Sequence, residues 1–199
     1  MVTRPYYLYI HMMLYNNYAT SVLKDLKTAI DDQIADFVEL VKFPKNTLLL
    51  SPGQRNLYYY VVETGILVNY YIRDTEEVVT SFTFPGDIVA DFRTAVFKIK
   101  STDYIKALSP VTVYRISVAD FDKLKKDNTI LLELERKLII AYALLLDERL
   151  RFIQHTTALE RYQFLMDHYP QLIATVSIRY IASYIGVKVE TLSRIRGKI

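Results

Sequence analysis

The chain contains a series of short runs between residues 47 and 117 in which apolar and polar positions alternate. The runs are rich in Val, Ile, Tyr, Phe and Thr, and turn-forming stretches such as SPGQ, RDTEE and FPGD separate them. In chain order they read TLLLS, YYYVVE, ILVNYYIR, VVTSFTF, DYIKAL and VTVYRIS. Short strands with such punctuation are typical of an antiparallel sandwich, jelly roll or barrel. The pattern therefore predicts a β-roll.

Apolar residues recur at helical spacing on both sides of this β region. Residues 20–42 predict one or two amphipathic helices, and residues 130–153 predict one long helix. The long helix is apolar over much of its circumference, so we expect one side to pack on its own domain and the other on a second copy of the chain. The predicted dimer seam comprises Leu131, Leu134, Leu138, Ala141, Tyr142, Leu145 and Phe152, widened by Leu132, Ile139 and Leu146. Burial of this helix inside a single domain is the alternative.

Three shorter helices are predicted after the long one. Thr157 and Glu160 match the Ser/Thr-x-x-Glu capping box, so the first of them begins near residue 158 and ends at the HYP stretch 168–170. Ser177 is placed to cap the second, which ends at Gly186, and the third occupies the last residues of the sequence. The fold class predicted is therefore α+β.

Charge is distributed unevenly. The 199-residue chain has a net charge of +3, and residues 151–199 alone hold seven Lys/Arg and three Asp/Glu, a net +4 that leaves −1 for the remainder. This asymmetry predicts a polyanionic partner for the C-terminal end. The longest apolar run, LIIAYALLL, is too short to cross a bilayer. We expect a cytoplasmic protein with no membrane partner.

The residue types exclude several kinds of site. The absence of cysteine excludes disulfides, thiolate zinc sites and iron–sulfur clusters. A cupin-like metal enzyme would need several His on the strands, but the three histidines, His11, His155 and His168, all lie outside residues 45–117. There is also no Ser-His-Asp arrangement and no phosphate-cradling glycine loop. We therefore expect no enzyme, no catalytic residue and no metal.

The last two helices have the spacing of a helix-turn-helix. Ala182 lets a second helix pack closely, and Gly186, four residues on, suits a turn with positive φ. Apolar residues that we expect to face inward are Ile178, Ile181, Ile185, Val187, Leu192 and Ile195. This leaves Glu190 and Arg194 together on the outer face of the last helix.

That outer face suits the major groove of DNA. Arg194 has the fork that reaches O6 and N7 of guanine, and Glu190 can accept from cytosine N4, so we predict that both contact bases. An i,i+4 surface pair without function is the alternative reading of these two residues. Side chains of the types that hold phosphates are Thr191, Ser193, Arg196, Lys198, Lys188 and Arg179, which we predict to contact the DNA backbone.

These residues resemble the Crp/Fnr superfamily of transcription regulators, over about residues 20–199. The most specific part, RYIASYIGVKVETLSRIR, is close to the IASYLG…ETLSRIR pattern of Bacteroidetes-type members, and ALERYQFLMDHYPQL is similar to their A-x-x-R-Y…P segment. The resemblance implies a cyclic-nucleotide-binding-like β-roll over residues 1–126, a dimerisation helix over 127–155 and a DNA-binding helix-turn-helix domain over 156–199. It also implies base reading by Glu190 and Arg194, a homodimer on an inverted repeat, and RNA polymerase as a further partner.

The roll departs from the family pattern at the effector pocket, whose candidate residues are Gly86, Asp87, Lys100, Ser101 and Thr102. Cyclic-nucleotide binders have Gly-Glu where this chain has Gly86-Asp87, and Ser101 stands where their phosphate-binding Arg is expected. Lys100 beside it lacks the bidentate fork of Arg. We therefore expect no cyclic AMP and no other cofactor, while a different small-molecule effector stays open.

Two further departures concern other parts of the chain. The cysteine cluster of oxygen-sensing relatives is absent, and Lys188-Val189 replaces the usual cap and proline before the recognition helix, which predicts a less firmly fixed helix start. The competing function is a ligand- or protein-interaction module that has kept the fold and lost DNA binding.

Overall fold

The computed structural model describes residues 24–25, 28 and 34–198. The chain divides into two compact units, residues 1–38 with 119–155 and residues 39–118 with 156–199. The second unit therefore holds both the β-roll and the terminal helices. The domain boundaries predicted at residues 126 and 155 stay a prediction.

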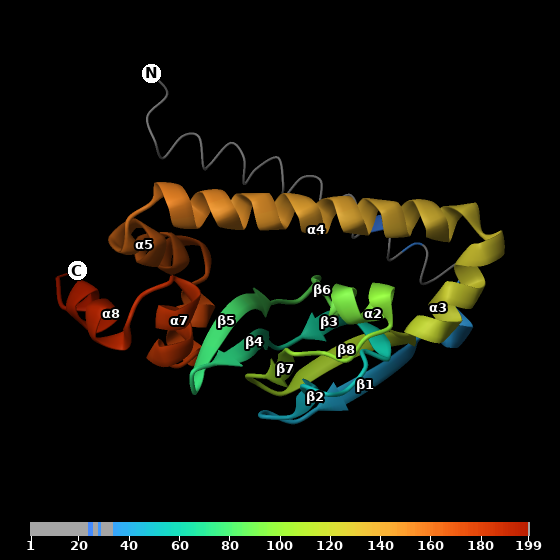
Figure 1. Ribbon diagram of the computed structural model, residues 1–199, viewed down its shortest axis with the longest axis horizontal. Coiled ribbons are helices and arrows are strands. Elements are labelled where there is room, and N and C mark those ends of the chain that lie inside the picture. The colour runs from blue at the N-terminus through green and yellow to red at the C-terminus, as the bar shows by residue number, and fades with distance from the viewer. Residues whose placement is uncertain (1–23, 26–27, 29–33, 199) are drawn as a thin grey trace, which may run out of the picture. The chain divides into compact units, whose positions relative to one another are not determined.

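The roll consists of two four-stranded antiparallel sheets, with strand orders β1-β8-β3-β6 and β2-β7-β4-β5 (Figure 1). The first sheet contains β1 (Glu39–Phe43), β3 (Tyr58–Thr64), β6 (Ile88–Val89) and β8 (Val111–Ser117). The second contains β2 (Leu48–Leu50), β4 (Leu67–Arg73), β5 (Glu76–Thr83) and β7 (Tyr104–Ala107). The six predicted runs all form strands, which confirms the predicted roll.

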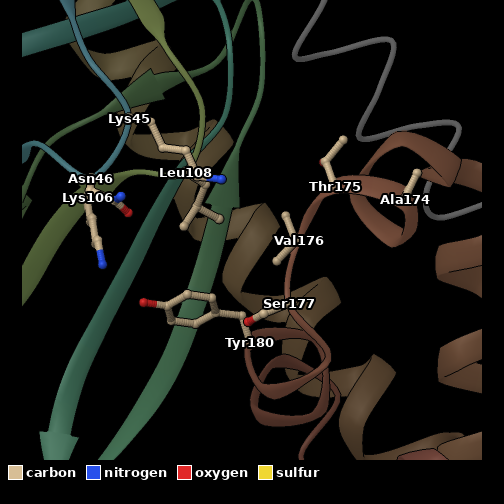
Figure 2. Close-up of a pocket in the computed structure, with 9 residues that line it drawn as sticks. All are labelled: Lys45, Asn46, Lys106, Leu108, Ala174, Thr175, Val176, Ser177 and Tyr180. Carbon is tan, nitrogen blue, oxygen red and sulfur yellow. The ribbon is translucent and has the colours of Figure 1, made fainter.

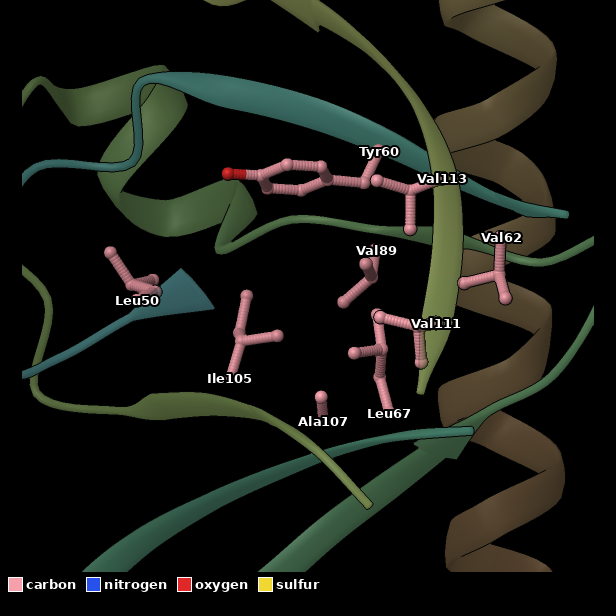
Figure 3. Packing of buried hydrophobic residues seen from close by; sticks show 9 residues of the cluster. All are labelled: Leu50, Tyr60, Val62, Leu67, Val89, Ile105, Ala107, Val111 and Val113. Carbon is pink, nitrogen blue, oxygen red and sulfur yellow. The ribbon is translucent and has the colours of Figure 1, made fainter. Parts of the chain in front are cut away.

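Both sheets contribute to one hydrophobic core. Figure 3 shows side chains from the two sheets pointing toward one another, among them Tyr60 and Val113 on one side and Leu67 and Ile105 on the other. Leu67, Ile105 and Val113 are fully buried. Alternation along each strand places these residues on the inner face, so burial of apolar surface holds the two layers together.

Gly65 joins β3 to β4 in a position that only glycine fits. Its φ is +92°, and a Cβ at this residue would lie 2.4 Å from the carbonyl oxygen of Pro110. The TG turn signal in the sequence therefore marks a close approach between two loops of the roll.

The prediction of helix through residue 42 is wrong at its end. Residues 35–37 form a single 3-10 turn, η2 (Ala35–Phe37), and β1 follows at Glu39. In β1, Glu39 pairs with Arg115 and Val41 with Val113 of β8, and the Arg115 guanidinium donates to the Glu39 carboxylate at 2.7 Å. Residues 39–43 form a strand because they pair with β8, about 70 residues away in the sequence. The helical spacing of apolar residues in a short window does not reveal such a distant partner. Residues 20–23, 26–27 and 29–33 of the predicted helices lie outside the described residues.

The first unit also contains α3 (Val118–Leu124), η3 (Lys125–Asp127) and the long helix α4 (Thr129–His155). Asn128 caps α4, since its side-chain oxygen accepts from the backbone N–H groups of Ile130 and Leu131 at 3.0 and 3.2 Å. Lys125 bridges to Asp122 and Glu135, which ties η3 to the first turns of α4. The predicted long helix is confirmed.

The apolar positions of α4 divide into an inner and an outer set. Leu131 and Leu134 of the predicted seam are buried within this chain, and Leu138, Ala141 and Phe152 are half-buried. Exposed apolar side chains follow spacings of three, four and seven residues along much of the helix, namely Leu132, Ile139, Tyr142, Leu145, Leu146, Leu150 and Ile153, while Ile130 and Leu144 are exposed as well. The residues expected only to widen the seam therefore form much of its outward stripe.

The terminal helices are α5 (Ala158–His168), α6 (Pro170–Thr175), α7 (Ile178–Tyr184) and α8 (Val189–Arg196). The capping box before α5 is confirmed, with the Glu160 carboxylate accepting from the Thr157 N–H at 2.7 Å. Helix α6 was not predicted; Pro170, which ends α5, stands at the first position of α6, where its missing N–H costs nothing. Helix α2 (Phe92–Phe97) in the roll was also not predicted.

Helix α7 lies against β5, the edge strand of the second sheet (Figure 1). The Ser183 hydroxyl donates to the carbonyl of Glu77 at 2.9 Å and accepts from the N–H of Val79 at 2.8 Å. It thereby satisfies two edge groups that no strand pairs. Phe82 packs against Tyr184 with ring centroids 5.1 Å apart, so the terminal helices and the roll form one packed unit.

Candidate nucleic-acid interface

The turn between α7 and α8 is closed by backbone hydrogen bonds around Gly186. The N–H of Val187 donates to the carbonyl of Ala182 at 3.0 Å, and that of Gly186 to the carbonyl of Ser183 at 3.1 Å. Gly186 has φ +72°. These are the 6→1 and 5→2 bonds of a Schellman motif, which needs a left-handed residue at this position. The predicted helix-turn-helix is therefore present, and its turn is fixed by Gly186.

Helix α8 has a buried and an exposed face. Leu192 is fully buried, and it packs in one cluster with Ala182, Ile181 and Ile185 of the preceding helix and turn. Val189 and Ile195 are partly buried against the same cluster. The residues predicted to contact DNA from this segment are all exposed; they are Lys188, Glu190, Thr191, Ser193, Arg194, Arg196 and Lys198.

Glu190 and Arg194 are not engaged by the protein. Within the described part of the chain neither side chain forms a hydrogen bond or an ion pair, so they are not a closed i,i+4 surface pair. At the start of the helix, Lys188 takes the N-cap position and makes no side-chain capping bond, as its sequence predicted. The exposed face of α8 thus presents an unpaired acceptor and an unpaired fork of donors one turn apart.

Arg179, on α7, has a partner inside the protein. Its guanidinium lies 3.1 Å from the Glu77 carboxylate on β5, with 61% of the Arg179 side chain exposed. A phosphate contact from this residue would have to compete with Glu77. Of the predicted backbone contacts, Arg179 is the one that the structure places in an ion pair.

Arg161 is a structural residue of this site that sequence reasoning missed. It is buried on α5 and donates to the carbonyl of Ile185 at 2.8 Å and to that of Thr156 at 2.5 Å. Burial lowers the pKa of its guanidinium below its usual range. Arg161 therefore ties α5 to the turn that sets the direction of α8. The A-x-x-R-Y pattern was the signal, although it gave no role for the arginine.

In the roll, the predicted effector residues fall into two separate hydrogen-bond groups. Ser101 is buried and donates to the carboxylate of Asp91 at 2.7 Å, while Thr102 donates to Asp103 at 2.8 Å. Arg93 reaches the Asp103 carboxylate at 3.0 Å, and Lys100 is exposed. The position expected to hold a phosphate-binding Arg is thus bonded to a buried acidic side chain, which disfavours an anion there.

Gly86 and Asp87 form the other group. Gly86 has φ +93°, and the carboxylate of Asp87 accepts from the N–H of Phe84 at 2.9 Å across its own turn. Burial raises the pKa of the Asp87 carboxyl above 3.8, and the hydrogen bond from Phe84 only partly offsets it. A group that burial favours in its neutral form is poorly suited to hold a ligand by charge.

The sequence is similar to known regulatory proteins, and part of it matches a known domain family. The cyclic nucleotide-binding domain family model matches residues 40–128. The anaerobic regulatory protein of Aggregatibacter actinomycetemcomitans is 28% identical over 181 residues, which cover 84% of this chain and 69% of that protein.

Solved structures are similar over most of the chain. The structure of FixK2 from Bradyrhizobium japonicum has a TM-score of 0.64 at 21% identity and covers 81% of this chain and 83% of its own. A Crp/Fnr-family regulator from Eubacterium rectale has a TM-score of 0.66 at 16% identity, covering 84% of this chain and 81% of its own.

The β-roll, the long helix and the helix-turn-helix thus occur in a chain that is similar to regulatory proteins in sequence and fold. The similarity to the regulatory proteins extends over 84% of the chain, well beyond the domain model alone. The chain thus matches the cyclic nucleotide-binding domain family over residues 40–128, and its fold is similar to that of a regulator of the Crp/Fnr family. The names of these similar proteins are those of regulators and not of enzymes.

No helix in the described ranges is long and apolar enough to span a bilayer. In the same ranges no three His, Cys, Asp or Glu side chains gather in a way that would hold a metal ion.

Proposed function

We propose that this chain regulates transcription as a homodimer that reads an inverted repeat through Glu190 and Arg194. The observation that carries the proposal is the outer face of α8, where both side chains are exposed and without a protein partner among the described residues. Arg194 would bind guanine O6 and N7, and Glu190 would accept from cytosine N4. Thr191, Ser193 and Arg196 would hold phosphates and so fix the register.

The dimer part of the proposal is supported by α4. Its outward apolar stripe has the three-four spacing of a helix that packs against a second helix. A two-fold dimer would place two α8 helices in successive major grooves about 34 Å apart, and an inverted repeat would match that symmetry. RNA polymerase is the further partner that we propose, with the cytoplasm as the place of action.

We further propose that the β-roll does not bind cyclic AMP. The hydrogen bond from Ser101 to the buried Asp91 supports it, since a cyclic phosphate would meet a carboxylate where a cation is needed. Cyclic AMP is expected to leave both the DNA affinity and the thermal stability of the protein unchanged. A cyclic AMP-dependent gain in affinity would overturn this part alone.

The decisive experiment selects bound duplexes from a random DNA pool and then measures affinity for the selected site. Arg194→Ala is expected to weaken binding by about 10- to 100-fold and to relax the preference at one base pair, since a bidentate contact contributes about 1–3 kcal/mol. Glu190→Ala is expected to relax the preference at the neighbouring position. Arg55→Ala, which removes an exposed arginine of the roll, is the matched control.

Salt dependence separates base reading from phosphate binding. Lys198→Ala is expected to reduce the slope of log affinity against log salt by about one, with the sequence preference unchanged. If the purified protein selects no sequence, or if Arg194→Ala binds as the wild type does, the proposal fails. The chain would then be an interaction module with this fold.

A further inference from the structure

A cavity that the DNA-binding proposal does not use lies where the roll meets the terminal helices, inside one compact unit. Its volume is about 370 Å³, within the range of sites for small molecules. One wall comes from the turn between β1 and β2 and from β7, and the other from the junction of α6 and α7. Figure 2 shows the lining side chains of both walls.

The wall on the roll carries two lysines held on a fixed backbone. Lys45 sits in a tight turn in which Asn46 has φ +71°. The N–H of Asn46 donates to the carbonyl of Ala107 at 2.8 Å, so the turn is pinned to β7 directly beside Lys106. Lys45 and Lys106 therefore keep their places on the same wall.

Neither lysine is neutralised by the protein. Among the residues that the structure describes, Lys45 and Lys106 form no ion pair and no side-chain hydrogen bond. The carboxylate of Glu77 is engaged with Arg179 on α7. Two cations on one wall without a counter-charge attract an anion, and lysine binds phosphate or carboxylate oxygens as a point charge.

The opposite wall offers hydroxyl groups and apolar surface. Ser177 stands at the start of α7, and its side chain makes no capping bond. Among the described residues, the hydroxyl of Tyr180 has only a long contact of 3.5 Å, to the Glu77 carboxylate. Leu108 and Val176 add aliphatic side chains to the lining, as Figure 2 shows. The lining thus pairs charge and hydroxyls with an apolar surface.

We propose that this cavity binds a small organic anion, a carboxylate or phosphate monoester that carries an apolar group. Lys45 and Lys106 hold the anionic group, and Leu108, Val176 and the ring of Tyr180 contact the apolar group. The site is distinct from the predicted effector position at Gly86–Asp87 and Lys100–Thr102, none of which lines it. Because its walls belong to the roll and to the terminal helices, a bound anion also holds these two parts together.

The test titrates the full chain, without DNA, with phenyl phosphate, benzoate and the neutral analogue benzyl alcohol, followed by saturation-transfer NMR at constant ionic strength. Saturable binding of at least one anion with a dissociation constant of about 0.1–1 mM is expected, since the cavity is open to solvent. Benzyl alcohol is expected not to saturate. Which of the two anions binds more tightly distinguishes a phosphate ligand from a carboxylate ligand.

Variants locate the site. Lys106→Met is expected to weaken binding by about tenfold, the loss of one charge-assisted hydrogen bond, and Lys45→Met by a smaller factor. Lys42→Met, at an exposed lysine of β1, is the control for net charge, and Lys100→Met the control for the predicted effector position. Both controls are expected to bind as the wild type does, and unchanged thermal unfolding shows that each variant is folded.

Three outcomes overturn the proposal: no saturable binding of either anion up to about 10 mM, equal binding by Lys106→Met and wild type, or loss of binding in Lys100→Met. The last would place the anion in the roll instead. None of these results bears on DNA recognition, because no DNA is present and neither Glu190 nor Arg194 is changed.

Discussion

At the scale of single residues, Arg161 shows how a buried charge supports an exposed site. The guanidinium donates to the carbonyls of Ile185 and Thr156, the residues that directly follow the last turns of α7 and α4, where helical partners run out. Burial lowers the pKa of Arg161, but a guanidinium remains charged at any pH at which the protein is folded. The Ile185 carbonyl belongs to the turn before α8, so this one side chain helps to fix the recognition helix.

Arg161→Met is expected to lower the free energy of unfolding by about 2–4 kcal/mol, because it leaves the buried carbonyl of Ile185 and the part-buried carbonyl of Thr156 without this donor, at about 1–3 kcal/mol each. Arg161→Lys is expected to lose less, since an ammonium can still reach one carbonyl. Urea unfolding followed by circular dichroism measures both, with Arg55→Met as the exposed control. Unchanged stability of Arg161→Met would show that the carbonyls find other donors.

At the scale of elements, α4 presents more apolar surface than a solvated helix tolerates. Ile139 and Leu146 are 53% and 50% exposed, and they lie seven residues apart on the same face as Tyr142. The buried Leu131 and Leu134 show that one side of the first turns packs within the chain, while Leu132 begins the outward stripe that continues along the rest of the helix. A second copy of α4 is the simplest cover for such a stripe.

The double variant Ile139→Glu with Leu146→Glu is therefore expected to be a monomer. Like charges at the centre of a helix pair would meet without water or counter-charge, which disfavours association by several kcal/mol. Sedimentation equilibrium at micromolar concentration distinguishes the 23.2 kDa monomer from a species of twice that mass. Leu57→Glu, at a leucine that is 62% exposed in the roll, is expected to remain a dimer. A monomeric wild type would contradict the proposed dimer.

At the scale of the whole molecule, the packing of the terminal helices on the roll affects the response to pH. Phe84 stacks on Tyr169 with ring centroids 5.1 Å apart, and Asp87, whose carboxylate accepts from the Phe84 N–H, interacts electrostatically with Tyr169. Burial raises the pKa of the Asp87 carboxyl and of the Tyr169 hydroxyl. Of these two groups only the Asp87 carboxyl ionises below neutral pH, so it is the one of the pair whose ionisation affects stability in acid.

Because the folded pKa of Asp87 is raised, the unfolded chain releases this proton first as the pH rises above 3.8. Stability is therefore lost between 3.8 and the raised folded pKa, and it stays lost at higher pH. Asp87→Asn is expected to raise Tm at pH 7 and to leave Tm unchanged at about pH 3, where the carboxyl is protonated in both states. Scanning calorimetry across this range tests it, with Asp74→Asn, whose side chain is 93% exposed, as the control. A lower Tm for Asp87→Asn at pH 7 would contradict the assigned direction.

Short sequence patterns predicted most of the helices and turns whose ends are fixed by residues close together in the chain. The capping box of Thr157 and Glu160 placed the start of α5, and Gly186 placed the turn before α8. Helix α2 went unpredicted because the strand pattern dominates residues 47–117, although Asp91 caps this helix by accepting from the N–H of Thr94. The strand β1 went unpredicted for a different reason: its pairing with β8 joins residues far apart in the sequence.

At the candidate interface, too, some features were predictable from the sequence and others were not. The amphipathic order of α8 alone placed Glu190 and Arg194 on its exposed face, and the structure agrees. The partners of other side chains were beyond the reach of local patterns. Glu77 engages Arg179 and Ser183 from about 100 positions away in the chain, and Asp91 accepts from Ser101, which lies beyond the helix that Asp91 caps.

The sequence by itself thus determined the class of this protein: a β-roll, a long helix, and a helix-turn-helix whose last helix presents Glu190 and Arg194. Periodicity, caps and turn residues act over a few positions, so a single sequence reveals them. Only the tertiary structure decided which charges are free and which are paired, and it alone brought Lys45 and Lys106 to a cavity facing Ser177 and Tyr180. The physical reason is that pairing and cavity formation depend on distances between segments far apart in the chain, which no local pattern encodes.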